Sequence, residues 1–110
     1  MAMEEGLDTG PVLLERKLKI GLLENADQLG ERLSRLTAEL MVEALPRIEM
    51  AGPGSEAERW RALDMRFQSD EHTYARMLQK GDYQIDWSAS ALSIHRKVMG
   101  LYPGAQTNCK

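Results

Sequence analysis

The residue best placed for chemistry in this sequence is Asp8, which stands between two glycines in the run Gly6-Leu7-Asp8-Thr9-Gly10. Glycine permits positive φ angles and a close backbone approach, so this spacing predicts a tight turn that holds one carboxylate in a fixed place. Loops supported by rigid elements are common positions for binding and catalytic residues. The alternative is a turn aspartate that only caps its own backbone, and the spacing alone leaves both interpretations open.

The other reactive side chains give weaker signals. His95 has no Asp or Glu at helical spacing and lies far from His72 in the sequence. We therefore interpret His95 as an ordinary helix-surface or linker histidine without a partner, and His72 as a loop residue. Cys109 is the only cysteine, which excludes an internal disulfide and a cysteine-based metal cluster. We assign Cys109 no role and predict no bound metal.

The composition fits one small domain. The chain has 110 residues, with 17 acidic and 14 basic side chains, and this slight acidic excess makes no global case for binding nucleic acid or anionic membranes. Charged residues interrupt each apolar run before it is long enough to cross a bilayer. The first residues lack the basic end and apolar core of a signal peptide. The predicted location is therefore cytoplasmic.

The segment that follows the Asp8 loop predicts a strand. The apolar run Val12-Leu13-Leu14 and the period-2 positions Leu14, Arg16, Leu18 and Ile20 are typical of a strand. We expect this strand to pair with residues 1–3 in a hairpin-like arrangement around the loop. Such a pair would hold Asp8 at the mouth of a rigid element.

A long helix is predicted next. Asn25 and Gln28 have the spacing of a capping box, and Pro46 disfavours a helical residue before it, so the predicted helix runs from residue 26 to about residue 45. Four leucines at helical spacing form one apolar stripe, which indicates core packing: Leu29, Leu33, Leu36 and Leu40.

Residues 51–55, rich in glycine and proline, are the strongest breaker in the chain and mark a predicted domain boundary. Ser55 predicts the start of a helix over residues 56–67, and a further helical piece is expected over residues 73–78. Ser88 is the predicted N-cap of a last helix over residues 89–99. Gln106 and Thr107 are expected to begin another strand.

Several short motifs follow in a recognisable order: the Asp8 loop, the capped leucine-rich helix, Thr73-Tyr74-Ala75, Ile85-Asp86-Trp87-Ser88, Ile94-His95-Arg96 and Pro103-Gly104-Ala105. This set resembles the folate-dependent formyltransferases over nearly the whole chain, and most of all the branch that acts on initiator Met-tRNA. The Ile-Asp-Trp-Ser block and the Pro-Gly-Ala turn argue against the glycinamide ribonucleotide enzyme. The formyl-folate dehydrogenase hydrolase domain and sugar-amine formyltransferases stay open as alternatives, as does a non-catalytic helical interaction module.

The resemblance implies an α/β fold. Residues 1–50 would be the C-terminal tail of a doubly wound sheet domain, with a strand hairpin and a long helix. Residues 51–105 would form a mainly helical inter-domain linker, and residues 106–110 would begin a C-terminal β-barrel domain. Because the family's catalytic Asn and His would lie upstream, we interpret the chain as an internal fragment that is inactive alone. Its exposed leucine face could drive self-association.

The resemblance also implies a reaction and a site. The reaction is transfer of a formyl group from 10-formyltetrahydrofolate to the amino group of Met-tRNA for translation initiation, without a metal. Asp8 would pair with the upstream His and help to move a proton. Four residues match the loop that holds the pterin ring of the co-substrate, largely through backbone groups: Glu4, Glu5, Gly6 and Leu7. Glu4 and Glu5 could equally be solvated acids.

Lys80 is the candidate for contact with tRNA phosphate, because it matches a basic linker position; the alternative is a solvated lysine.

Two departures from the family pattern stand out. Phe67 occupies a position before Gln68 where relatives commonly carry a proline, which puts the path of residues 66–69 in doubt. Asn25 stands where many relatives have Thr, a neutral exchange between capping residues.

Overall fold

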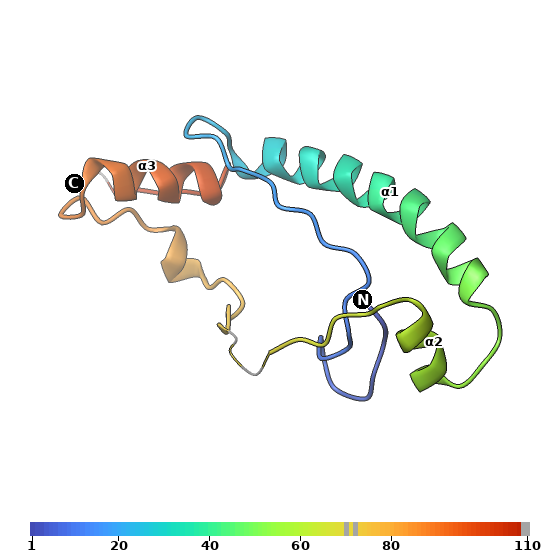
Figure 1. Ribbon diagram of the computed structural model, residues 1–110. Coiled ribbons are helices and arrows are strands. Elements are labelled where there is room, and N and C mark those ends of the chain that lie inside the picture. Colours follow the sequence, from blue (N-terminus) through green and yellow to red (C-terminus); the bar gives the residue numbers. More distant parts are fainter. Residues whose placement is uncertain (70, 72, 109–110) are drawn as a thin grey trace. The chain divides into compact units, whose positions relative to one another are not determined.

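The computed structural model describes residues 1–69, 71 and 73–108, and this part of the chain is mainly helical (Figure 1). Its elements are α1 (Ala26–Ala51), α2 (Glu56–Ala62), the 3-10 helix η1 (Lys80–Tyr83) and α3 (Ala91–Gly100). The chain divides into two compact units. Unit 1 comprises Met1–Lys17 and Arg35–Thr73, and unit 2 comprises Leu18–Ser34 and Tyr74–Lys110.

The start of α1 confirms the predicted capping box. The backbone N–H of Asn25 donates to Gln28 Oε1 (3.0 Å), and the N–H of Gln28 donates to Asn25 Oδ1 (2.9 Å). These two bonds satisfy N–H groups that the first turn of a helix leaves without intrahelical partners. The four leucines of the stripe all lie in this helix, as expected.

The predicted end of α1 near residue 45 is wrong, because the helix continues through Pro46 to Ala51. A proline inside a helix removes one backbone hydrogen bond, but the turns on either side can still hold the helix together. The helix ends where Gly52 adopts a left-handed backbone with φ of 65°. Its N–H donates to Glu49 O at 3.1 Å, which closes the last turn.

The predicted strand over residues 11–20 is not formed, and the hairpin with residues 1–3 is not confirmed. In the described part of the chain, only Val12 of this segment makes a bridge, and its antiparallel partner is Arg66. Residues 1–3 contact the segment through one backbone bond, from Ala2 N to Pro11 O (2.9 Å). A strand needs a neighbour to accept and donate its hydrogen bonds, and beyond the Val12 bridge the described residues offer this segment no such neighbour.

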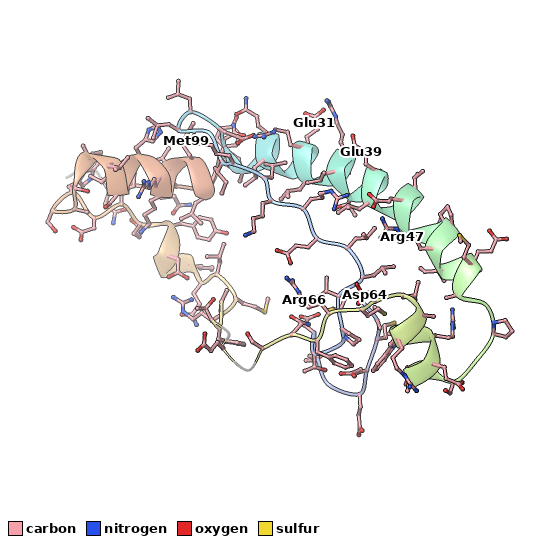
Figure 2. All side chains as sticks on the ribbon, viewed as in Figure 1. Glu31, Glu39, Arg47, Asp64, Arg66 and Met99 are labelled. Carbon is pink, nitrogen blue, oxygen red and sulfur yellow. The ribbon has the colours of Figure 1, made fainter. Side chains whose placement is uncertain are left out.

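Helix α2 begins as predicted and ends early. Ser55 caps it in a box with Glu58, whose carboxylate accepts from the backbone N–H of Ser55 (2.9 Å). The predicted extension to Phe67 is wrong, because Asp64 adopts a left-handed backbone with φ of 51° and turns the chain. The turn brings the Phe67 ring to 5.8 Å from the ring of Trp60, edge to face. Figure 2 shows Asp64 and Arg66 on the segment that follows α2.

The predicted helical piece over residues 73–78 is also absent. The guanidinium of Arg76 donates to both carboxylate oxygens of Asp82 (2.7 and 2.6 Å) and to Met77 O (2.9 Å). These bonds hold residues 76 and 77 against Asp82 in an irregular path. The N–H of Gln79 donates to the same Asp82 carboxylate (2.7 Å). The Asp82 side chain therefore binds both Arg76 and Gln79 in the segment before η1.

The last helix starts two residues later than predicted. Its N-cap is Ser90, whose hydroxyl accepts from the N–H of Ser93 (3.2 Å). Ser88 instead donates its N–H (2.9 Å) and hydroxyl (2.6 Å) to Asp86, which lowers the pKa of that carboxyl. Gln106 forms an isolated parallel bridge with Gln84 rather than a longer strand within the described residues.

Apolar side chains are little covered. Among the described residues no hydrophobic side chain of the helices is fully buried, and only Pro11 falls below 2% exposure among the large side chains. Leu29, Leu36 and Leu40 are half-buried and Leu33 is 45% exposed, so the expected core packing of the stripe is incomplete. No helix in the described ranges is long and apolar enough to cross a membrane.

The ion pair of Arg76 with Asp82 makes the start of η1 sensitive to acid. The guanidinium lowers the pKa of Asp82 from 3.8 to about 2, chiefly through its hydrogen bonds. Because the folded pKa is depressed, the stabilising interaction is complete above 3.8 and is lost as the pH falls toward 2.

We therefore expect Arg76→Gln to return the pKa of Asp82 toward its ordinary value, as measured by NMR titration of the side-chain carboxyl. Arg47→Gln is the control, since Arg47 pairs with Glu43 in unit 1 and should leave the Asp82 titration unchanged. An Asp82 titration that is the same in both variants would contradict this account.

Candidate functional site

The Asp8 loop lies in unit 1 and forms the predicted tight turn. Asp8 has a left-handed backbone with φ of 57°, a conformation that Asp and Asn tolerate better than most residues. Its side chain is exposed. Among the described residues the Asp8 carboxylate makes no hydrogen bond or ion pair, so the structure gives no support to the interpretation that it caps its own backbone.

Position 10 requires glycine because the backbone of Ala2 approaches it closely. A Cβ atom at this position would lie 2.0 Å from the carbonyl oxygen of Ala2, far inside van der Waals contact. Gly10 and the adjacent Pro11 are the buried end of the loop. The turn is therefore fixed at its C-terminal side by the path of residues 1–3.

A segment from beyond α2 also holds the loop. The N–H of Val12 donates to Arg66 O (2.8 Å), and the N–H of Arg66 donates to Val12 O (2.9 Å). The guanidinium of Arg66 also pairs with Glu15. Two residues further on, Gln68 Nε2 donates to Asp8 O (2.7 Å) and to Gly10 O (2.8 Å). Sequence reasoning singled out the neighbouring Phe67 and missed Gln68, since no local pattern marks a side chain that acts 60 residues away.

The four residues expected to hold the pterin ring are all exposed. The hydroxyl of Thr9 donates to Glu4 Oε2 (3.2 Å), which links the two sides of the turn. Leu7 is 95% exposed at the tip of the loop. The structure thus brings Glu4, Glu5, Gly6 and Leu7 together beside Asp8, and their role in folate binding stays a prediction.

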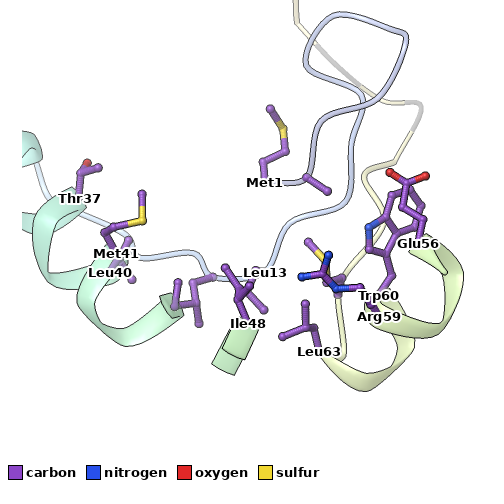
Figure 3. Close-up of a pocket in the computed structure, with 14 residues that line it drawn as sticks. Met1, Leu13, Thr37, Leu40, Met41, Ile48, Glu56, Arg59, Trp60 and Leu63 are labelled. Carbon is purple, nitrogen blue, oxygen red and sulfur yellow. The ribbon is translucent and has the colours of Figure 1, made fainter. Parts of the chain in front are cut away.

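Unit 1 also contains an apolar cavity of about 410 Å³, shown in Figure 3. Residues from the N-terminal segment, from the extended segment, from α1 and from α2 line it, and Leu13, Leu40 and Trp60 are typical of its walls. The Nε atom of Arg59 is buried without a hydrogen-bond partner in the described part of the chain. Asp8 and the four loop residues are not among the lining residues, so this cavity is separate from the predicted site.

The basic side chains of unit 2 differ in how they are engaged. Arg76 is paired with Asp82, and Lys97 Nζ donates to Gln84 O. Lys80 is exposed, and no described residue serves as its partner. Lys80 is therefore accessible to a phosphate group, and its contact with tRNA stays a prediction.

His95 does have a partner, contrary to the sequence interpretation. Its Nε2 atom lies 2.6 Å from the carbonyl oxygen of Leu22, so the ring fastens α3 to the turn before α1 within unit 2. This contact assigns His95 a structural place. His72 and Cys109 lie outside the described residues. Within the ranges described, no group of three or more His, Cys, Asp or Glu side chains could hold a metal ion.

Comparison with known proteins agrees with the motifs. A model of the formyl transferase C-terminal domain matches residues 77–110. The methionyl-tRNA formyltransferase of Synechococcus sp. (strain WH7803) is 72% identical over 97% of this chain and 32% of its own length. The chain resembles a part of this enzyme. The predicted resemblance to a formyltransferase is thereby confirmed.

Other methionyl-tRNA formyltransferases are similar over the same extent. That of Parasynechococcus marenigrum (strain WH8102) is 68% identical over 98% of this chain, and that of Prochlorococcus marinus (strain MIT 9313) is 58% identical over 96%. The chain spans about a third of the length of these curated relatives, 32% in each case. No solved structure matches the chain significantly.

The close approach at Gly10 predicts a specific intolerance. Gly10→Ala would place a Cβ atom against the Ala2 carbonyl, and relieving such overpacking typically costs about 1–3 kcal/mol of folding free energy. The measurement is the free energy of unfolding in urea. Gly30→Ala is the matched control, because nothing lies within 4 Å of its added Cβ in α1. Alanine there should stabilise the helix by about 0.5–1 kcal/mol. Equal stability of the two variants would refute the close approach.

Proposed function

We propose that this chain is part of a methionyl-tRNA formyltransferase, a transferase that moves a formyl group from 10-formyltetrahydrofolate to the amino group of Met-tRNA. One observation carries the proposal: 72% identity, over 97% of the chain, to a protein of that name. The exposed carboxylate of Asp8, held on a left-handed turn, is consistent with it. Such a protein would act in the cytoplasm, at translation initiation.

The reaction asks for two things of the protein. The attacking amine must lose a proton, and the oxyanion of the tetrahedral intermediate must be stabilised. Asp8 offers a carboxylate that no described residue neutralises, and it would pair with a histidine from the remainder of the protein and favour its protonated form. The oxyanion donors would come from that remainder as well, so this chain alone would not transfer formyl groups.

The loop residues before Asp8 would hold the co-substrate. Glu4 is tied to Thr9, which shapes the turn, while Gly6 and Leu7 present backbone and side chain to solvent. A pterin ring held by backbone groups would need this exposure. The extended residues 13–20 would then gain strand partners from a doubly wound sheet elsewhere in the protein, which would also cover the leucine stripe of α1.

Lys80 is our candidate for contact with the tRNA backbone. Arg76 and Lys97 are engaged within unit 2, whereas Lys80 is exposed and unengaged among the described residues. A lysine in that condition can neutralise a phosphate without losing an internal interaction. This role is electrostatic and should carry no sequence specificity.

The central test is Asp8→Asn in the complete protein. This exchange keeps the shape of the side chain and its tolerance of left-handed backbone, and removes only the charge. We expect turnover to fall about 10²–10⁴-fold, the range for general acid–base assistance, with folate affinity nearly unchanged. Turnover is measured with Met-tRNA and 10-formyltetrahydrofolate.

Asp64→Asn is the matched control for this test, because Asp64 also has a left-handed backbone, with φ of 51°. It should keep near-parental turnover. Parental turnover in Asp8→Asn would reduce Asp8 to a turn residue. Formyl-folate consumption that does not depend on Met-tRNA would point instead to a hydrolase or to another formyltransferase of the family.

The Lys80 proposal is tested by Lys80→Ala. We expect weaker tRNA binding and a salt dependence reduced by about one ion in the logarithmic slope, with folate binding unaffected. Binding is measured by filter retention of Met-tRNA across a salt series. Lys17→Ala, which removes an exposed lysine of unit 1, serves as control. If both variants bind tRNA like the parent at low salt, Lys80 is a solvated lysine.

A further inference from the structure

The carboxamide of Gln68 makes two bonds that converge on the Asp8 turn. Its Nε2 atom lies 2.7 Å from Asp8 O and 2.8 Å from Gly10 O, and it also lies 3.3 Å from Met1 Sδ. Both oxygens are backbone carbonyls and can only accept hydrogen bonds. The nitrogen of the carboxamide, which has two hydrogens, must therefore face the turn.

These two bonds hold the backbone of the loop at and just after Asp8. Asp8 has a left-handed backbone, which is unfavourable for a residue with a side chain unless surrounding contacts maintain it. Gln68 binds the carbonyl of Asp8 itself and the carbonyl two residues later. Holding both carbonyls fixes the Asp8–Thr9 and Gly10–Pro11 peptide planes, and the first of these sets the direction in which the Asp8 side chain leaves the backbone.

Gln68 is itself held from both sides of unit 1. Arg66 pairs with Val12 through two backbone bonds of 2.8 and 2.9 Å and forms an ion pair with Glu15. Phe67 packs edge to face against Trp60 of α2, with ring centroids 5.8 Å apart. The backbone around Gln68 is therefore held in place by its neighbours. The two hydrogen bonds of the carboxamide connect the segment after α2 to the Asp8 loop.

We propose that Gln68 is a positioning residue for Asp8 in formyl transfer. The inference rests on the proposed function, because it concerns the carboxylate to which that function assigns the proton transfer. Gln68 does not need to touch the substrate. It acts by holding the turn so that the Asp8 carboxylate stands where its partner histidine can meet it, and small displacements of such groups can lower rates about 10²-fold.

The test uses Gln68→Glu in the complete protein. Glutamate has the same shape but replaces the donor with an acceptor, which would then face two carbonyl oxygens. We expect turnover to fall about 10-fold or more, with the KM for 10-formyltetrahydrofolate changed much less. Gln28→Glu is the matched control: there the side-chain oxygen accepts from Asn25 N–H, and glutamate preserves that bond. Its turnover should stay parental.

Two further measurements separate positioning from a loss of stability. Hydrogen exchange of the amides of residues 6–10 should accelerate in Gln68→Glu and not in Gln28→Glu. Turnover of the double variant Gln68→Glu/Asp8→Asn should equal that of Asp8→Asn alone, because Gln68 acts through Asp8. If Gln68→Glu does not fold, Gln68→Met removes the donors without adding a charge, and the same comparisons apply to it.

The outcomes distinguish this inference from the proposed function. If Asp8→Asn keeps parental turnover, the proposed role of Asp8 fails and the role of Gln68 in catalysis falls with it. If Asp8→Asn is impaired while both Gln68 variants keep parental turnover and loop exchange, only the Gln68 inference is overturned. A double variant whose losses multiply would likewise overturn it, because Gln68 would then act independently of Asp8.

Discussion

Unit 1 depends on one backbone pairing, the two hydrogen bonds between Val12 and Arg66. A bridge of this kind joins chain segments far apart in the sequence, and closing the long loop between them costs entropy that the contacts around the bridge must help to offset. Three other contacts follow from it. Glu15 meets Arg66, Phe67 reaches Trp60, and Gln68 reaches the carbonyls of the Asp8 turn. Without the bridge, residues 66–68 would not be aligned with the residues that they contact.

What could be predicted from the sequence was mostly local. The capping box at Asn25 and the helix start at Ser55 occur as expected, because the residues of each cap are three positions apart and contact each other whatever the rest of the chain does. The glycine-bounded Asp8 turn follows for the same reason. Errors of boundary arose where two local signals compete: Pro46 did not stop α1, and Ser90 capped α3 in place of Ser88.

What could not be predicted was non-local. The strand over residues 11–20 requires a neighbouring strand, which no periodicity within the segment can supply. Gln68 and His95 contact backbone carbonyls of distant residues. Every residue has a backbone carbonyl, so the sequence does not show which one a side chain binds. The electrostatics of unit 2 are similar. A count of basic residues groups Arg76 with Lys80, yet only the structure shows that Asp82 already neutralises Arg76.

The edge-to-face contact of Trp60 with Phe67 also supplies an optical signal. The chain has two tryptophans, Trp60 in unit 1 and Trp87 in unit 2. Trp87 is 67% exposed, so its indole emits from a largely aqueous environment, whereas the half-buried Trp60 sits against another ring beside the bridge. We therefore expect the two indoles to emit at different wavelengths. Fluorescence can follow the docking of the Arg66–Gln68 segment separately from events in unit 2, without any added label.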